Sequence, residues 1–174
     1  MSAFGGKADM TIALRKLVRL GGLSPIVWER DDMKVILRRA TEVDAKHAAS
    51  LLTELGYPST EADARDRLVR SLRSATSYCL VAELAAEVVG LISAELVFYF
   101  PTGSTICRIT SLVVSSQHRG HGLGRKLLTA AIDFAREHHC SGLELTSAEG
   151  RVDAHRLYRR LGFSRTSFRF FQTF

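Results

Sequence analysis

The sequence is poor in cysteine and has no long hydrophobic run. Its 174 residues include three cysteines, Cys79, Cys107 and Cys140, and no two of them form a CxxC pair. Three thiols cannot all pair with one another, so free cysteines in a reducing compartment are expected. No apolar stretch approaches the roughly 20 residues that cross a bilayer. Arg15 and Lys16 interrupt the only apolar segment near the N-terminus, which argues against a secretory signal. These absences predict a cytoplasmic protein with no membrane partner.

The sequence also lacks internal repeats and low-complexity tracts, and its length suits one domain. The net charge of +6 is unevenly spread, because residues 119–174 carry ten Lys/Arg against five Asp/Glu. A basic region attracts nucleic acid, an anionic membrane or a small polyanion, and it is equally compatible with a plain solvated surface. A nucleic-acid module needs basic residues interleaved with aromatics on one face. Here the arginines fall mainly on two predicted helices, so no nucleic-acid partner is expected.

Hydrophobic periodicity divides the chain into an N-terminal extension of unknown role, residues 1–33, and a domain over residues 34–174. Within the extension, a short amphipathic helix over 11–20 is compatible with the pattern. The domain begins with a strand and continues with two helices, a hairpin whose turn is Ala85-Ala86, another strand, a helix, a short strand, a helix and a closing strand. The predicted strands are 33–40, 77–84, 87–100, 106–114, 143–147 and 167–174. This alternation indicates a mixed sheet flanked by helices.

Three glycines on alternate positions, Gly120, Gly122 and Gly124, stand between the strand over 106–114 and the helix after it. A strand, a glycine-rich turn and a helix start form an anion site, because the first N–H groups of the helix are unpaired and carry the positive end of its dipole. The alternative is a glycine-rich turn that serves tight packing only. A P-loop is excluded, because no Gly-Lys-Ser/Thr follows at the required spacing. A dinucleotide fingerprint is excluded as well, because the spacing is GxGxG and lies late in the chain.

Arg119, Gly122 and Gly124 fit the pattern RxxGxG. Together with "LVV" at 112–114 and "AHRLYRRLGF" at 154–163, this pattern resembles the GNAT superfamily of acyl-CoA-dependent N-acyltransferases over roughly residues 34 to 172. The resemblance implies an α+β fold in three layers (α/β/α), with a mixed, mostly antiparallel sheet and a splayed central strand pair. It also implies acetyl-CoA as the acyl-donor cosubstrate and direct transfer to an amine in a ternary complex. No metal site is expected.

The same resemblance assigns roles to residues. The backbone of Leu112, Val113 and Val114 would hydrogen-bond the pantetheine arm, with a backbone N–H near Val113 serving the oxyanion. Backbone N–H groups of the loop would hold the pyrophosphate; these belong to Arg119, Gly120, His121, Gly122, Leu123, Gly124 and Arg125. Tyr158 takes the place of the general acid that protonates the departing thiolate, and a phenol with a reference pKa of about 10 stays protonated at neutral pH. The alternative for Tyr158 is a core tyrosine.

The general base is not fixed by the sequence. The strand position where many relatives carry an acid holds Ser111, which is no base by itself. Glu95 and Glu144 are the candidates carried forward, because each lies on a predicted strand beside the cleft. His155 and His121 are alternatives, as are a relay through water and an amine that arrives deprotonated.

The acceptor is also open. The C-terminal block looks like that of aminoalkylphosphonate N-acetyltransferases, and Arg151 stands where many relatives carry an asparagine, so it could meet a phosphate or an anionic acceptor. The loop at Tyr57-Pro58 and the aromatics at 98–100 are expected near the acceptor, or else the aromatics form a plug between sheet and helices. The sequence therefore predicts an N-acetyltransferase for a small amine, with a homodimer possible. A catalytically idle CoA-binding module and an enzyme acting on a protein amine are the alternatives.

Overall fold

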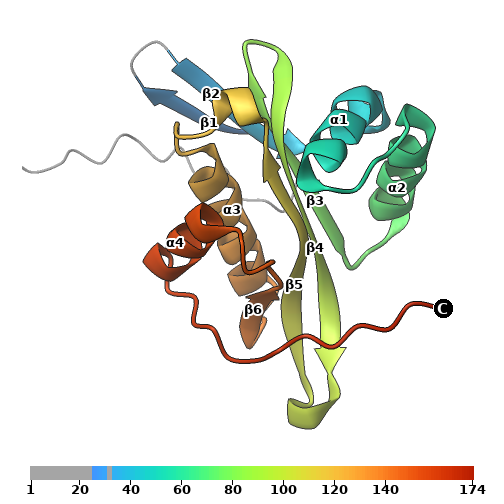
Figure 1. Ribbon diagram of the computed structural model, residues 1–174, viewed down its shortest axis with the longest axis vertical. Helices are drawn as coiled ribbons and strands as arrows, with labels where there is room; N and C mark the ends of the chain where they lie inside the picture. The colour runs from blue at the N-terminus through green and yellow to red at the C-terminus, as the bar shows by residue number, and fades with distance from the viewer. Residues whose placement is uncertain (1–24, 31–32) are drawn as a thin grey trace, which may run out of the picture.

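The computed structural model describes residues 25–30 and 33–174, which form three layers around one six-stranded sheet (Figure 1). The strands are β1 (Ile26–Arg30), β2 (Met33–Arg39), β3 (Ser77–Leu84), β4 (Glu87–Tyr99), β5 (Ser104–Val114) and β6 (Gly142–Leu145). They lie in chain order across the sheet. All neighbours are antiparallel except β5 and β6, which are parallel. The predicted α+β fold with a mixed, mostly antiparallel sheet is confirmed.

Two helices cover each face of the sheet (Figure 1). On one face lie α1 (Ala45–Leu55) and α2 (Glu61–Arg73), and on the other lie α3 (Leu123–Glu137) and α4 (Val152–Arg160). The central helix α3 packs on the sheet through an apolar stripe. Leu127, Leu128 and Ala131 are fully buried, and positions 127, 128 and 131 lie on the same side of a helix. Leu157 and Tyr158 of α4 pack against the same cluster. These two helices thus bring the glycine stretch and the predicted general acid to the same side of the sheet.

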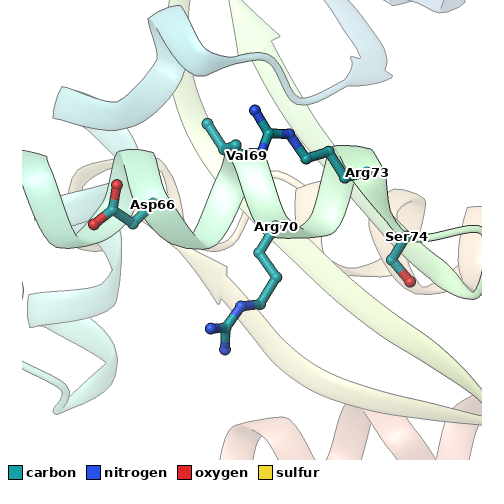
Figure 2. Close-up of a pocket in the computed structure, with 5 residues that line it drawn as sticks. All are labelled: Asp66, Val69, Arg70, Arg73 and Ser74. Carbon is teal, nitrogen blue, oxygen red and sulfur yellow. The ribbon is translucent and has the colours of Figure 1, made fainter.

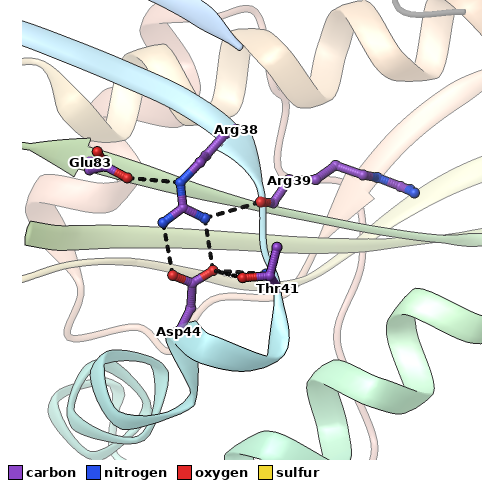
Figure 3. A network of polar contacts seen from close by, with 5 residues as sticks. All are labelled: Arg38, Arg39, Thr41, Asp44 and Glu83. Atoms are coloured by element: carbon purple, nitrogen blue, oxygen red, sulfur yellow. Dashed lines mark hydrogen bonds and ion pairs between the residues drawn. The ribbon is translucent and has the colours of Figure 1, made fainter. Parts of the chain in front are cut away.

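An ion pair between the buried Asp44 and the partly exposed Arg38 fixes the entry into α1 (Figure 3). Asp44 is 3% exposed, and both of its carboxylate oxygens accept hydrogen bonds of 2.8 Å from the Arg38 guanidinium. The Thr41 N–H donates a further bond of 2.8 Å to Asp44, and the Arg38 Nε donates to Glu83 at 2.8 Å. Burial raises the pKa of Asp44, but the hydrogen bonds from Arg38 and Thr41 outweigh burial and hold the pKa below its usual value. The pair therefore joins β2, β3 and the start of α1 as one unit.

The turn between β3 and β4 confirms the predicted hairpin. Leu84 pairs with Glu87, which leaves Ala85 and Ala86 as a two-residue loop, and both have left-handed φ angles of 49° and 66°. Two-residue hairpin loops of this kind match the twist of the strands but favour Asn and Gly. Two alanines therefore hold a strained conformation here.

The structure differs from the sequence-based assignment at both ends. Strand β1 was not predicted, although it pairs with β2 along its length and lies inside the segment assigned to the extension. The helix predicted over 11–20 lies outside the described residues. The closing strand predicted over 167–174 is wrong, because residues 163–174 adopt no strand. A run of strand-forming residues becomes a strand only when it finds an edge to pair with, and no hydrogen bond joins residues 166–174 to the remainder of the described chain.

Candidate active site

The glycine loop follows β5 through a short 3-10 turn, Ser116–His118, and ends where α3 begins. Gly120 and Gly122 have left-handed φ angles of 83° and 77°, a conformation that costs other L-residues energy. A Cβ added at either position would meet no heavy atom within 4 Å. The space in front of both glycines is therefore open, so their role is not packing against the protein.

The amide groups of this loop have no acceptors in the part of the chain that the structure describes. No backbone N–H from residue 119 to residue 125 donates a hydrogen bond to another described residue, and the first backbone bond of α3 runs from the Lys126 N–H to the Gly122 carbonyl at 3.1 Å. Such unpaired N–H groups, together with the positive end of the helix dipole, bind phosphate groups. The backbone of the loop thus fits a pyrophosphate, as the sequence predicts.

Gly124 has a different role from the other two glycines. Its Cβ would lie 3.4 Å from Leu157 of α4 and 3.8 Å from Val114 of β5. Gly124 therefore lets α3 approach α4 and β5 closely, whereas the neighbouring Leu123 side chain is 1% exposed and anchors the first turn of α3.

The Arg119 side chain holds the loop in place. Its Nε donates to the Val114 carbonyl at 3.1 Å, and its Nη2 lies 3.4 Å from Glu54 Oε2. The same Glu54 oxygen accepts the Ser116 N–H at 2.8 Å. Glu54 of α1 thus ties the loop to the opposite layer, a contact that the sequence analysis missed because 62 residues separate Glu54 from Ser116.

Strands β5 and β6 separate beside this loop. They pair only from Ile106 with Gly142 to Ile109 with Leu145, and β5 then continues to Val114 with β4 as its one partner within the described residues. The expected splay is present. Its free edge on β5 includes Leu112, Val113 and Val114, which leaves backbone groups for an extended ligand to pair with like an added strand.

Tyr158 lies on the inner face of α4. Its ring contacts Phe163, with ring centroids 6.0 Å apart, and His155, with centroids 6.5 Å apart. Burial raises the pKa of Tyr158 above its ordinary value, and the charge of Arg151 and a hydrogen bond with Ser147 partly offset that rise. His155 Nε2 in turn lies 3.1 Å from Ser147 Oγ. A half-buried phenol that stays protonated at neutral pH is suited to donate a proton.

Ser147 and Arg151 complete the surroundings of Tyr158. Ser147 was not singled out by sequence, and only its position after β6 brings it to α4. The Arg151 Nη2 donates to the Leu55 carbonyl of α1 at 2.7 Å. No carboxylate within the described chain lies within 4.0 Å of the Arg151 guanidinium, so its charge is balanced by no ion pair.

The two candidate bases lie in one row across three strands. Glu95 of β4 is opposite Arg108 of β5, and Arg108 is opposite Glu144 of β6. Arg108 Nε donates to Glu144 Oε1 at 2.5 Å, and Glu95 accepts a short hydrogen bond from Ser77 Oγ. Both carboxylates are thus engaged. The geometry brings them to the same face without choosing between them.

The aromatics at 98–100 form no plug. Phe98 and Phe100 are 65% and 85% exposed and sit at the hairpin tip where β5 begins, whereas the glycine loop follows the end of β5. Strand β5 has 11 residues, so ten steps of about 3.3 Å separate its two ends by roughly 33 Å. The structure therefore does not bring these aromatics to the glycine loop.

An open hollow of about 530 Å³ lies along α2, lined by Asp66, Val69, Arg70, Arg73 and Ser74 (Figure 2). The guanidinium groups of Arg70 and Arg73 point to different sides of the helix in this view, so they do not converge on one ligand. The hollow contains none of the residues predicted to bind acetyl-CoA.

Within the described residues, no group of three potential metal ligands occurs, and no helix combines the length and apolar character needed to cross a membrane.

Known proteins share this arrangement. Residues 39–163 match the family model described as the acetyltransferase (GNAT) family. The aminoalkylphosphonate N-acetyltransferase of Salmonella typhimurium is 33% identical over 148 residues, which cover 83% of this chain and 96% of that protein. Against the rodent N-acetyltransferases that it also resembles, the chain spans less than half of their length.

Solved structures agree on the fold. A transcriptional regulator from Bacillus halodurans superposes with a TM-score of 0.75 at 26% identity, covering 80% of this chain and 99% of that one. The aminoglycoside N-acetyltransferase AAC(6')-Iy in complex with CoA superposes with a TM-score of 0.70 at 14% identity, covering 90% of this chain and 98% of that one.

Proposed function

Because the chain belongs to the GNAT acetyltransferase family and is an acetyl-CoA-dependent N-acetyltransferase, we propose that it acetylates the primary amine of a small molecule by direct transfer in a ternary complex. The observation that carries this proposal is the open glycine loop beside the splayed strands, with Tyr158 on the neighbouring helix. In this arrangement the backbone N–H groups of residues 119–125 hold the pyrophosphate. The free edge at Leu112, Val113 and Val114 holds the pantetheine arm and aims the thioester into the splay.

Direct transfer is favoured over an acyl-enzyme because the described cysteines are poor nucleophiles. Cys107 is fully buried, and burial raises its pKa to about 12. Burial likewise raises the pKa of Cys79 to about 12 and raises that of Cys140. Since the thiolate is the reactive form, these side chains remain thiols at neutral pH. We also propose a cytoplasmic location, which the free thiols of the described cysteines support.

The amine attacks the thioester carbonyl, and the C–S bond breaks as the tetrahedral intermediate collapses. The thiolate that leaves takes the phenolic proton of Tyr158, whose raised pKa keeps it protonated until that step. The amine must lose a proton, and Glu95 of β4 and Glu144 of β6 are the candidate acceptors. For Glu144 to accept this proton, its ion pair with Arg108 would have to break and be replaced by a contact with the ammonium group of the acceptor.

We further propose that the acceptor carries an anionic group, as an aminoalkylphosphonate does. Arg151 supports this, because its guanidinium lies close enough to Tyr158 to influence the pKa of the phenol and no carboxylate of the described residues lies within 4.0 Å of it. One N–H of Arg151 is used by the Leu55 carbonyl, which leaves the others for a phosphonate. The named activity of the Salmonella relative points to the same class of acceptor.

The test is thiol release from acetyl-CoA with pairs of acceptors of equal chain length, an aminoalkylphosphonate against an uncharged alkylamine. Tyr158→Phe keeps the ring but removes the proton donor, and we expect kcat to fall by roughly 100-fold for every acceptor. Arg151→Gln is expected to raise KM for the phosphonate by roughly tenfold or more and to leave KM for the uncharged amine unchanged. Equal effects of Arg151→Gln on both acceptors would reject the anionic acceptor. Full activity of Tyr158→Phe would reject the proton donor.

A further inference from the structure

The polar side chains of Ser147 and His155 form a short chain of contacts that ends at the Tyr158 phenol. Ser147 Oγ lies 3.1 Å from His155 Nε2, and a side-chain hydrogen bond links Ser147 to Tyr158. The rings of His155 and Tyr158 lie close by, with centroids 6.5 Å apart. Ser147 therefore stands between the histidine and the phenol.

The chain brings Ser147 to α4 by continuing the alternation of β6. Leu143 and Leu145 are half-buried and pack on the core, whereas Glu144 and Thr146 are exposed. Ser147 takes the next half-buried position, on the side of the two leucines, because side chains two residues apart in an extended chain point the same way. A hydroxyl thus lies where the pattern would otherwise place an apolar side chain.

His155 reaches the same place from α4. It lies three residues before Tyr158, and side chains at this spacing are neighbours on a helix surface. The His155 ring is half-buried. No described residue hydrogen-bonds its Nδ1, and that atom is open to solvent. Water can therefore satisfy Nδ1, which lets Nε2 carry the proton of the neutral ring and donate it inward.

The direction of these hydrogen bonds decides where the phenolic proton points. A phenol and a serine hydroxyl each have one proton to donate. If Tyr158 donated to Ser147, its proton would be directed away from the thiolate. If His155 Nε2 donates to Ser147 Oγ, the serine hydroxyl can donate to the phenolic oxygen, and the phenolic proton stays free. Ser147 lowers the pKa of Tyr158, which is the effect of a donor to the phenolate.

We propose that His155 is a positioning residue of the acetyl transfer, whose Nε2–H holds the Ser147 hydroxyl as a donor to the Tyr158 oxygen. This role rests on the proposed function, because it matters only where Tyr158 protonates the departing thiolate. As the C–S bond breaks, the phenolic proton moves to the sulfur of CoA and negative charge appears on the phenolic oxygen. The hydrogen bond from Ser147 then becomes charge-assisted and stronger, while Ser147 and His155 keep their own protons. The contact therefore stabilises the transition state more than the ground state.

Two substitutions of His155 separate donation from packing. His155→Gln keeps an N–H donor near the place of Nε2, whereas His155→Leu keeps an apolar body without a donor. In steady-state acetyl transfer, we expect kcat of His155→Leu to fall roughly tenfold, with KM for the acceptor and Kd for CoA unchanged. His155→Gln is expected to restore most of kcat. Equal losses in the two variants, or a loss expressed in KM alone, would overturn the proposal.

A matched control is available in α3. His138 is also a half-buried histidine with one ring hydrogen bond, between its Nδ1 and the Phe134 carbonyl at 2.9 Å, but it follows the end of α3 that lies away from the glycine loop. His138→Leu is expected to keep the wild-type kcat. A loss in His138→Leu equal to that in His155→Leu would show a general effect of losing a histidine and would also overturn the proposal.

A double-mutant cycle with Tyr158→Phe tests whether His155 acts through the phenol. Phenylalanine has no oxygen for Ser147 to donate to, so His155→Leu is expected to leave the kcat of Tyr158→Phe unchanged. A further loss of roughly tenfold in that background would reveal a purely structural role and overturn the positioning of Ser147. The proton donor would survive that outcome. Full activity of Tyr158→Phe by itself would instead reject the donor, and the role of His155 with it.

Discussion

Replacing Gly122 by alanine separates the role of the glycine loop in folding from its role in binding. Gly122 precedes α3 with φ of 77°, and a Cβ there would meet nothing within 4 Å. The cost to the free protein is therefore only that of the left-handed conformation, about 1–2 kcal/mol. In a domain of this size, that loss lowers Tm by about 2–8 °C.

The cost to the bound state is larger. The added methyl group would occupy the open space in front of the loop and push the pyrophosphate away from the N–H groups of α3. Losing one hydrogen bond to a charged group costs about 1.5–3 kcal/mol, so the Kd for CoA should rise roughly tenfold to 100-fold.

Isothermal titration calorimetry with CoA measures this effect, and Gly103→Ala is the matched control. Gly103 also has a left-handed φ, 64°, and free space for a Cβ, but it lies at the hairpin tip, where β5 begins. We expect both variants to lose similar stability and only Gly122→Ala to lose affinity. Wild-type affinity in Gly122→Ala would refute the placement of the pyrophosphate. An equal loss in Gly103→Ala would show that the effect is global.

Three further changes probe other parts of the chain. Asp44→Asn should cost about 1.5–3 kcal/mol in urea unfolding at pH 7, because Arg38 is partly exposed and keeps Glu83 as a partner. The stability that Asp44 contributes is present above its unfolded pKa of about 3.9 and is lost as pH falls through the lower folded pKa, so wild-type stability should drop below pH 4 more steeply than that of the variant. Ala85→Asn with Ala86→Gly should raise the free energy of unfolding by about 1 kcal/mol, because it relieves two left-handed alanines; an unchanged urea midpoint would contradict the strain. Ser147→Ala removes a hydrogen bond that lowers the pKa of Tyr158. The alkaline limb of the pH profile of kcat/KM should therefore move to higher pH. An unchanged alkaline limb would show that Ser147 does not influence the proton donor.

Local patterns determined most of the elements of this protein. The apolar spacing of Leu127, Leu128 and Ala131 defines the buried stripe of α3, and apolar runs that become nearly continuously buried define β3 and β4. The glycine loop could be predicted from the sequence because the residues of its pattern, Arg119 to Gly124, are consecutive. Even so, the sequence could not separate Gly122, which leaves space for a ligand, from Gly124, which lets two helices touch.

Tertiary structure alone decided the contacts between distant residues. Glu54 reaches Ser116, Arg151 reaches Leu55, and Glu95, Arg108 and Glu144 line up only because three strands adopt one register. Pairing between strands depends on long-range geometry that no local window contains, and the same reason explains the unpredicted β1 and the wrong closing strand. Residues 167–174 have the composition of a strand, but a strand exists only where an edge receives it.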